Sequence, residues 1–272
     1  MPSGNLISMK LIRFELKADP SKIRSGIVQA GKVYETEGGQ GVGVHEAALV
    51  RPLIPVAKTT SVRIFHREFQ PDALQQMEME DFHYFVGNPG SLIGPSQIVP
   101  YPYWTDHLTV VPYLAAVVLG DAWKVDIQYA DELILGVTIM AVLVAHDTFQ
   151  QDRKLGRGMG RSYDVAAAFG PVLTTPEELD GSVTNDEVGR RYELESVVRI
   201  NGVEKTRGNS VDLPLTLAQA IQSASQGAPL REGDIVAIGP LVDEPELVRI
   251  DPEDEIQVAV ESLGAISIKM DA

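Results

Sequence analysis

The stretch VVPYLAAVVLG, Val110 to Gly120, decides how this chain folds. It is apolar and rich in β-branched residues, and a glycine ends it. This combination predicts a buried strand. A second run, VTIMAVLVAHD from Val137 to Asp147, has the same character and predicts a second buried strand. Two such strands point to a mostly β core.

The remaining local patterns agree with a β-rich fold. Alternation predicts a strand over Leu11 to Leu16, and glycine turns predict hairpins at Ala30-Gly31 and Asn201-Gly202. An amphipathic helix is expected in LPLTLAQAIQSAS (213–225), and short helices in ADELILG (130–136) and TTPEELDG (174–181). The acidic PDALQQMEMEDF (71–82) is a short helix or a mobile segment. We predict an N-terminal subdomain over residues 1–75 and a larger domain over 76–272.

Composition excludes several classes of partner and site. The chain has 272 residues, a formal charge of -15 and no cysteine. The charge argues against nucleic acid and anionic membranes, because phosphate groups are bound by basic surfaces. The absence of cysteine excludes disulfides, thiolate zinc sites and a cysteine nucleophile. The apolar run 133–145 is too short to span a bilayer, and no signal peptide is apparent, so a cytoplasmic protein is expected.

Several segments resemble motifs of the fumarylacetoacetate hydrolase family, and they occur in that family's order. They are YFVGNPGSLIGPSQIVPYP (84–102), LAAVVLGDAW (114–123), ILGVTIMAVLVAHDTFQ (134–150), GMGRSYDVAAAFGPVLTTPEEL (158–179), VRINGVEKTRGNS (198–210), LREGDIVAIGP (230–240) and DEIQVAVESLGAISIKM (254–270). The resemblance covers about two thirds of the chain.

This resemblance implies an α+β, mostly β fold, in which a mixed β-roll follows a small N-terminal α/β subdomain. It also implies a homodimer and the cleavage or rearrangement of 1,3-dicarbonyl or 2-oxo acid substrates. In that family a magnesium ion is held by a Glu-x-Glu strand and by an aspartate of the next strand. Magnesium prefers hard anionic oxygens and stabilises the enolate that develops in the reaction.

The positions of those carboxylates are apolar in this chain. Counted back from the VVLG end, the Glu-x-Glu pair falls on Pro112 and Leu114, and the aspartate falls on Val142. Moving the alignment by one residue restores no ligand, because residues 109–119 contain no acid. The sequence therefore predicts that the metal site is lost, that no cofactor is bound, and that an apolar pocket takes its place.

Other residues at motif positions are candidates for chemistry or binding. Arg161 falls on a family lysine and would grip a carboxylate or enolate, while His146, with Asp147, and His66, with Glu68, are candidate acid-base groups. We expect the substrate-binding residues to be Asn88, Pro112, Leu114, Val142, Phe149 and Tyr163. Tyr113 is expected to point to the opposite face of its strand, as a packing residue.

Three functions follow from this pattern. The first is an enzyme that catalyses metal-independent cyclisation, isomerisation or dehydration of a largely apolar 1,3-dicarbonyl, tetronate or tetramate-like substrate in natural-product biosynthesis. The second is a non-catalytic binding or partner protein of the same fold. The third is an ordinary metal-dependent hydrolase, isomerase or decarboxylase of the family, with ligands recruited from Asp106, Asp121 or Asp147.

Overall fold

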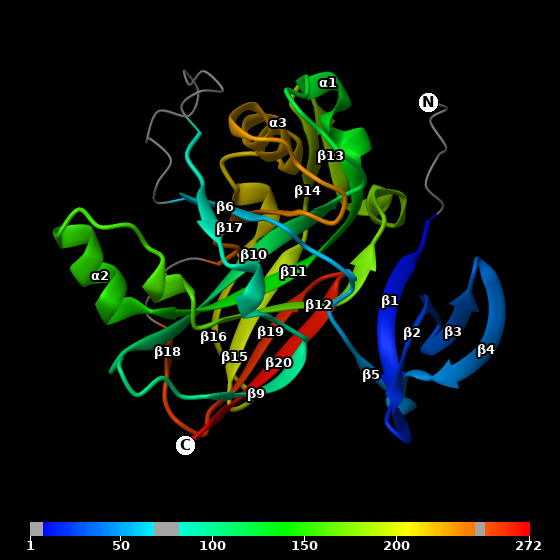
Figure 1. Ribbon diagram of the computed structural model, residues 1–272, viewed down its shortest axis with the longest axis horizontal. Coiled ribbons are helices and arrows are strands. Elements are labelled where there is room, and N and C mark those ends of the chain that lie inside the picture. The colour runs from blue at the N-terminus through cyan, green and yellow to red at the C-terminus, as the bar shows by residue number, and fades with distance from the viewer. Residues whose placement is uncertain (1–7, 68–81, 243–247) are drawn as a thin grey trace.

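The computed structural model describes residues 8–67, 82–242 and 248–272. Within them, thirteen strands form one large sheet (Figure 1). They are β1 (Lys10–Leu16), β2 (Asp19–Gln29), β3 (Lys32–Glu37), β4 (Gln40–Glu46), β5 (Val50–Pro52), β6 (Val62–His66), β7 (Phe85–Gly87), β8 (Leu92–Ile93), β10 (Leu108–Val118), β11 (Ile134–Ala145), β12 (Ala166–Thr174), β17 (Ile235–Gly239) and β18 (Arg249–Ile250). The main path runs β4-β3-β2-β1-β12-β11-β10-β17-β6-β7.

A second sheet of five strands packs against the first. In the order of the sheet these are β16 (Val203–Asn209), β15 (Glu195–Ile200), β19 (Glu255–Val260), β20 (Gly264–Asp271) and β9 (Ser96–Pro100). A separate hairpin joins β13 (Val183–Asp186) to β14 (Gly189–Tyr192). The α-helices are α1 (Ile127–Ala130), α2 (His146–Lys154) and α3 (Leu217–Gly227), and the short 3₁₀ helices include η1 (Ala47–Leu49), η6 (Asp131–Leu133), η7 (Arg161–Tyr163) and η8 (Pro176–Ser182). The predicted mostly β class is confirmed.

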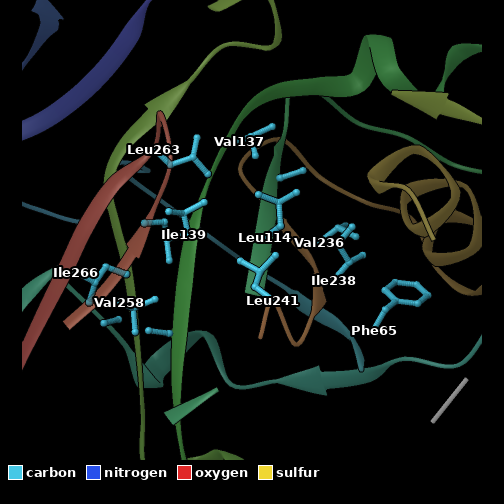
Figure 2. Close-up of a cluster of buried hydrophobic side chains, with 14 of the residues drawn as sticks. Phe65, Leu114, Val137, Ile139, Val236, Ile238, Leu241, Val258, Leu263 and Ile266 are labelled. Carbon is cyan, nitrogen blue, oxygen red and sulfur yellow. The ribbon is translucent and has the colours of Figure 1, made fainter. Parts of the chain in front are cut away.

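The two long apolar runs form β10 and β11, which pair along almost their whole length. Every residue of β10 is buried, because both faces of the strand are covered. One face packs against the five-stranded sheet, where Leu114 and Ile139 lie in the same core as Val258 and Ile266 (Figure 2). The other face carries Tyr113 in a second core. Coverage on both sides explains why the run shows no polar alternation.

The turn predictions hold in detail. Ala30 and Gly31 link β2 to β3 with φ values of 49° and 76°, and Asn201 and Gly202 link β15 to β16 with φ values of 51° and 76°. Two successive residues with positive φ are what a type I′ hairpin turn requires, and glycine adopts that conformation without a steric penalty.

Two helix predictions need correction. The helix expected over 130–136 stops early, because η6 ends at Leu133 and β11 begins at Ile134. Pairing with β10 gives Ile134 a buried place in the sheet, which outweighs its local preference. The helix expected over 174–181 is the 3₁₀ helix η8.

The N-terminal region is built from strands. In residues 8–66 the helical element is the three-residue η1, and β1 joins β12 of the central sheet. The segment 71–81, the helix candidate of the predicted α/β subdomain, lies outside the described residues, as does the boundary predicted at residue 75. That domain division stays a prediction. In the described parts of the chain, no helix has the length and apolar character needed to cross a membrane.

Candidate functional site

The pairing of β10 with β11 decides which residues share a face. Val142 lies opposite Val111, whereas Pro112 lies opposite Ala141 and Leu114 opposite Ile139. Directly opposed residues of an antiparallel pair point to the same side, and neighbours along a strand point to opposite sides. Val142 therefore shares its face with Val111 and Tyr113, while Pro112 and Leu114 point to the other face.

This geometry corrects the expectation that Pro112, Leu114 and Val142 line one site. Leu114 is 1% exposed and lies in the core between the two sheets (Figure 2). The side of β10 that faces away from this core is the side on which Tyr113 lies. Tyr113, which the sequence suggested was a packing residue on the far face, thus points with Val111 toward the candidate site.

Around Tyr113 lies a group of rings, called here the aromatic cluster: His66, Phe85, Tyr113, Phe149 and Tyr163. The ring of His66, at the end of β6, is 5.9 Å from the ring of Tyr113 and 6.3 Å from that of Tyr163, both edge-on. Tyr163 is also 4.7 Å from Phe85 and 5.9 Å from Phe149. Segments far apart in the sequence thus bring three of the predicted residues, His66, Phe149 and Tyr163, into one cluster.

His66 is the buried titratable group of this cluster. Its side chain is 4% exposed. Burial, with a smaller contribution from the positive charge of Arg153, lowers the pKa of His66 to about 4. A neutral imidazole is a proton acceptor at physiological pH. Arg153, which no sequence motif singled out, lies on α2 and places its guanidinium 5.6 Å from the ring centre of Phe149.

His146 and Asp147 do not form the predicted acid-base pair. They open helix α2 and do not end a strand, as the run from Val137 to Asp147 had suggested. The Asp147 carboxylate accepts hydrogen bonds from the Thr105 hydroxyl, at 2.6 Å, and from the Asp106 amide, at 3.0 Å. Burial raises the pKa of Asp147, but these bonds outweigh it and the net pKa is lowered. Asp147 therefore fixes a loop to α2.

His146 lies beside the aromatic cluster. Its ring is 5.9 Å from Phe149 and 4.9 Å from the ring of His107. Its Nε2 is 3.3 Å from the Nε2 of Gln150. Through the rings of Phe149 and Tyr163, these contacts connect His146 to His66.

Arg161 and Asn88 lie near the cluster but at the surface. The exposed Arg161 guanidinium stacks over the ring of Trp104, 4.4 Å from its centre. The Asn88 side-chain amide donates to the Asp164 carboxylate at 2.8 Å, and its oxygen accepts from the Gly90 amide at 2.8 Å. Glu68, the proposed partner of His66, lies outside the described residues.

A cavity of about 320 Å³ opens next to the cluster. Among the residues that the structure describes, its lining includes His83, Tyr84, Phe85 and Met159. Phe85 belongs both to this lining and to the aromatic cluster, and its ring contacts that of Tyr163. The walls are aromatic rings and a thioether, which suit an apolar or planar group.

The residues at this site do not suit a magnesium ion. Magnesium requires several carboxylate or other hard oxygen ligands, and the strand positions that face the cluster carry Val111, Tyr113 and Val142. In residues 8–67, 82–242 and 248–272, no three His, Asp or Glu side chains are grouped as metal ligands. Of the alternative acids, Asp121 pairs with Arg231 at 2.6 Å, and Asp147 is held as described above.

The sequence of this chain is similar to the sequences of several known proteins. The chain is 27% identical over 184 residues to an uncharacterised protein of Pyrococcus abyssi, covering 67% of this chain and 76% of that protein. It is 24% identical over 190 residues to the oxaloacetate tautomerase YisK of Bacillus subtilis, covering 67% of this chain and 59% of that protein.

Solved structures share the whole fold. A 5-carboxymethyl-2-hydroxymuconate delta-isomerase from Mycobacterium smegmatis superposes with a TM-score of 0.76 and 23% identity, over 97% of this chain and 98% of that chain. A fumarylacetoacetate hydrolase from Exiguobacterium antarcticum gives 0.77 and 19%, over 97% and 100%. Residues 60–270 match the family described as fumarylacetoacetate (FAA) hydrolase C-terminal. The chain therefore belongs to the fumarylacetoacetate hydrolase family.

Proposed function

We propose that this protein is an enzyme of the isomerase or tautomerase type, which moves a proton on an enolisable 1,3-dicarbonyl substrate without a metal ion. The observation that carries the proposal is the position of His66, a buried, neutral histidine between two tyrosine rings, on the face where Val111 and Val142 lie. The names of two relatives, a tautomerase and an isomerase, support the same reaction class.

The proposed chemistry needs a base and a positive charge. The neutral imidazole of His66 removes the proton from the carbon between two carbonyl groups, and the electron pair of that C–H bond passes into an enolate. The imidazolium then returns the proton to the enolate oxygen, or to another carbon, which gives the tautomer or isomer. Arg153 is close enough to His66 to lower its pKa, and its charge favours the enolate in the same way.

The substrate would carry an apolar part. Among the described residues, the cavity beside Phe85 is lined by rings and by Met159, and Phe85 contacts Tyr163 of the cluster. Cyclisation and dehydration of tetronate or tetramate-like compounds begin with the same proton removal, so these reactions, and a place in natural-product biosynthesis, belong to the proposal. Arg161 remains our candidate anchor for a substrate carboxylate. The homodimer and the cytoplasmic location also stay predictions.

A second function is favoured by one specific observation. Tyr113, His66, Phe149 and Tyr163 are each 6% exposed or less, so side chains fill the space above Val111 and Val142. A filled site suits a binding or partner protein that has no catalytic role. An enzyme with this structure must move the Phe85 or Tyr163 ring when the substrate enters from the cavity.

The test is a tautomerisation assay in the presence of EDTA. The enol forms of oxaloacetate and acetylpyruvate are added to the protein, and the decay of enol absorbance is followed. We expect acceleration by the wild-type chain and a loss of about 100-fold or more in His66→Gln, as for a general base. The control is His45→Gln, on the N-terminal strand β4 and away from the aromatic cluster.

The two functions predict different outcomes. Equal rates in wild type and His66→Gln would overturn the role of His66. No acceleration of either enol by the wild-type chain, combined with saturable binding of acetylpyruvate, would favour the non-catalytic protein. Activity that disappears with EDTA and returns with magnesium would show that the metal-independent proposal is wrong.

A further inference from the structure

A second cavity, called here the Arg13 cleft, lies between the N-terminal strands and the central sheet. Its volume is about 530 Å³, larger than the cavity beside Phe85. One wall comes from β1 and β2, a second from residues 55–58, and the floor includes Val117 of β10 and Leu135 of β11. In Figure 1 these N-terminal strands stand to the right of the central sheet.

The cleft has its own position on the sheet. Val117 follows Tyr113 by four residues on the same strand and on the same face. At the rise of a β-strand this corresponds to roughly 13 Å. The Arg13 cleft is therefore separate from the aromatic cluster, and an occupant would touch neither His66 nor Tyr163.

Arg13 supplies unused hydrogen-bond donors to this cleft. Its Nη1 donates to the carbonyl oxygens of Ile54, at 2.9 Å, and of Val56, at 2.5 Å, which fixes the side chain in place. Among the described residues, Nε and Nη2 have no hydrogen-bond acceptor, and Arg13 has no ion-pair partner. Partial burial lowers the pKa of Arg13, so its guanidinium is partly removed from water while it still carries its charge.

The other cleft residues define what fits beside that charge. Ser25 and Thr36 contribute hydroxyl groups, and Lys58 contributes a second cation at the exposed rim. Glu232, also exposed at the rim, is the one acid among the described lining residues. Leu11, Val56, Val117 and Leu135 make much of the remaining surface apolar. The pattern is an apolar hollow with a fixed, planar donor at one side.

We propose that the Arg13 cleft binds a small monocarboxylate with an apolar body. The carboxylate would accept hydrogen bonds from Nε and Nη2 of Arg13, which present two parallel N–H groups that match a carboxylate. The apolar body would lie against Val117 and Leu135. This site stands independently of the proposed tautomerase activity.

The experiment is calorimetric titration with phenylacetate, compared with phenylacetamide, which has the same body and no charge. We expect saturable binding of phenylacetate, and binding at least about tenfold weaker for phenylacetamide, because the charged hydrogen bonds are lost. Propionate, which keeps the carboxylate and lacks the ring, is also expected to bind more weakly.

Three variants locate the binding site. Arg13→Gln removes the charge, and Ala57→Trp fills the cleft while leaving Arg13 in place; both are expected to weaken phenylacetate binding about tenfold or more. Lys32→Gln removes a surface cation that pairs with Glu46 outside the cleft, and should bind as wild type does. Two variants are needed because Arg13→Gln also removes the hydrogen bonds to Ile54 and Val56 and can therefore disturb the local structure. Ala57→Trp keeps those bonds.

Two results would overturn this proposal. One is equal affinity for phenylacetate and phenylacetamide, or no binding of phenylacetate. The other is unchanged phenylacetate binding in Ala57→Trp, with loss in His66→Gln, which would assign the carboxylate to the aromatic cluster. The tautomerisation assay tests the aromatic cluster independently of the carboxylate titration. Failure of the carboxylate-site proposal therefore leaves the tautomerase proposal standing, and the reverse also holds.

Discussion

His66 shows how burial and a nearby positive charge keep a histidine neutral. An exposed histidine is partly protonated near neutral pH, whereas the buried ring of His66 stays neutral down to a pH of about 4. Its neighbours are two tyrosine rings and the positive charge of Arg153, and both surroundings disfavour the imidazolium.

The same shift predicts how stability depends on pH. In the unfolded chain His66 binds a proton near pH 6.5, but in the folded chain only near pH 4, so the folded state loses stability as the pH falls through this window. The maximum contribution is roughly 3 kcal/mol. In His66→Gln, urea unfolding between pH 7 and pH 5 should show a smaller loss of stability than in wild type. His83→Gln, at an exposed position, should retain the wild-type slope; an equal slope in His66→Gln would contradict the assignment.

At the scale of elements, α3 shows how a sequence signal becomes a stable boundary. The Thr216 hydroxyl accepts a hydrogen bond from the Gln219 amide at 3.1 Å, and the Gln219 side chain accepts one from the Thr216 amide at 2.9 Å. This reciprocal pair satisfies two backbone donors that the helix cannot. The buried face of α3, with Ala220, Ile221 and Ala224, then packs into the main core.

The cap gives an element-scale prediction. Thr216→Ala should lower the free energy of unfolding by about 1 kcal/mol, because the Gln219 amide loses its acceptor and the Val188 carbonyl loses a donor. Thr216→Ser keeps the hydroxyl and should stay much closer to wild type. Chemical denaturation of both variants measures the difference, and equal losses in the two would show that the methyl group matters and the cap does not.

Over the whole molecule, Asp234 joins segments that are far apart in the sequence. Its buried carboxylate accepts hydrogen bonds from the Thr60 amide and hydroxyl, the Ser61 amide and the Arg231 amide, at 2.7 to 3.1 Å. These bonds hold the residues before β6 against the start of β17, and the two strands then pair in parallel up to His66. The place of His66 therefore depends on a carboxylate at the opposite end of its strand.

Asp234→Ala should consequently lower the free energy of unfolding by about 2 to 4 kcal/mol, since it leaves several donors without an acceptor. Amide hydrogen exchange along β6 should also become faster. Asp121→Ala is the matched control, because Asp121 is exposed and its ion pair with Arg231 is worth about 1 kcal/mol or less. Similar losses in the two variants would mean that Asp234 does not organise this junction.

The features that depend on local physics can be predicted from the sequence. The apolar character of β10 and β11, the positive-φ hairpins at Ala30-Gly31 and Asn201-Gly202 and the helix at 217–227 follow from residue type and spacing. So does the absence of any acid over 109–119. Three members of the aromatic cluster, His66, Phe149 and Tyr163, are also candidates on their motif positions alone.

Long-range packing, in contrast, settles which face of β10 meets His66. Side chains alternate with a period of two, so an alignment error of one residue exchanges the two faces of a strand. Counting back from Gly120 crosses the irregularity that the β10–β11 pairing shows at Val117/Val118, and it selects Pro112 and Leu114. The pairing with Val142 selects Val111 and Tyr113. The role of Arg153 and the Arg13 cleft cannot be predicted from the sequence for the same reason. Both depend on contacts between residues far apart in the chain, and no local sequence pattern indicates those contacts.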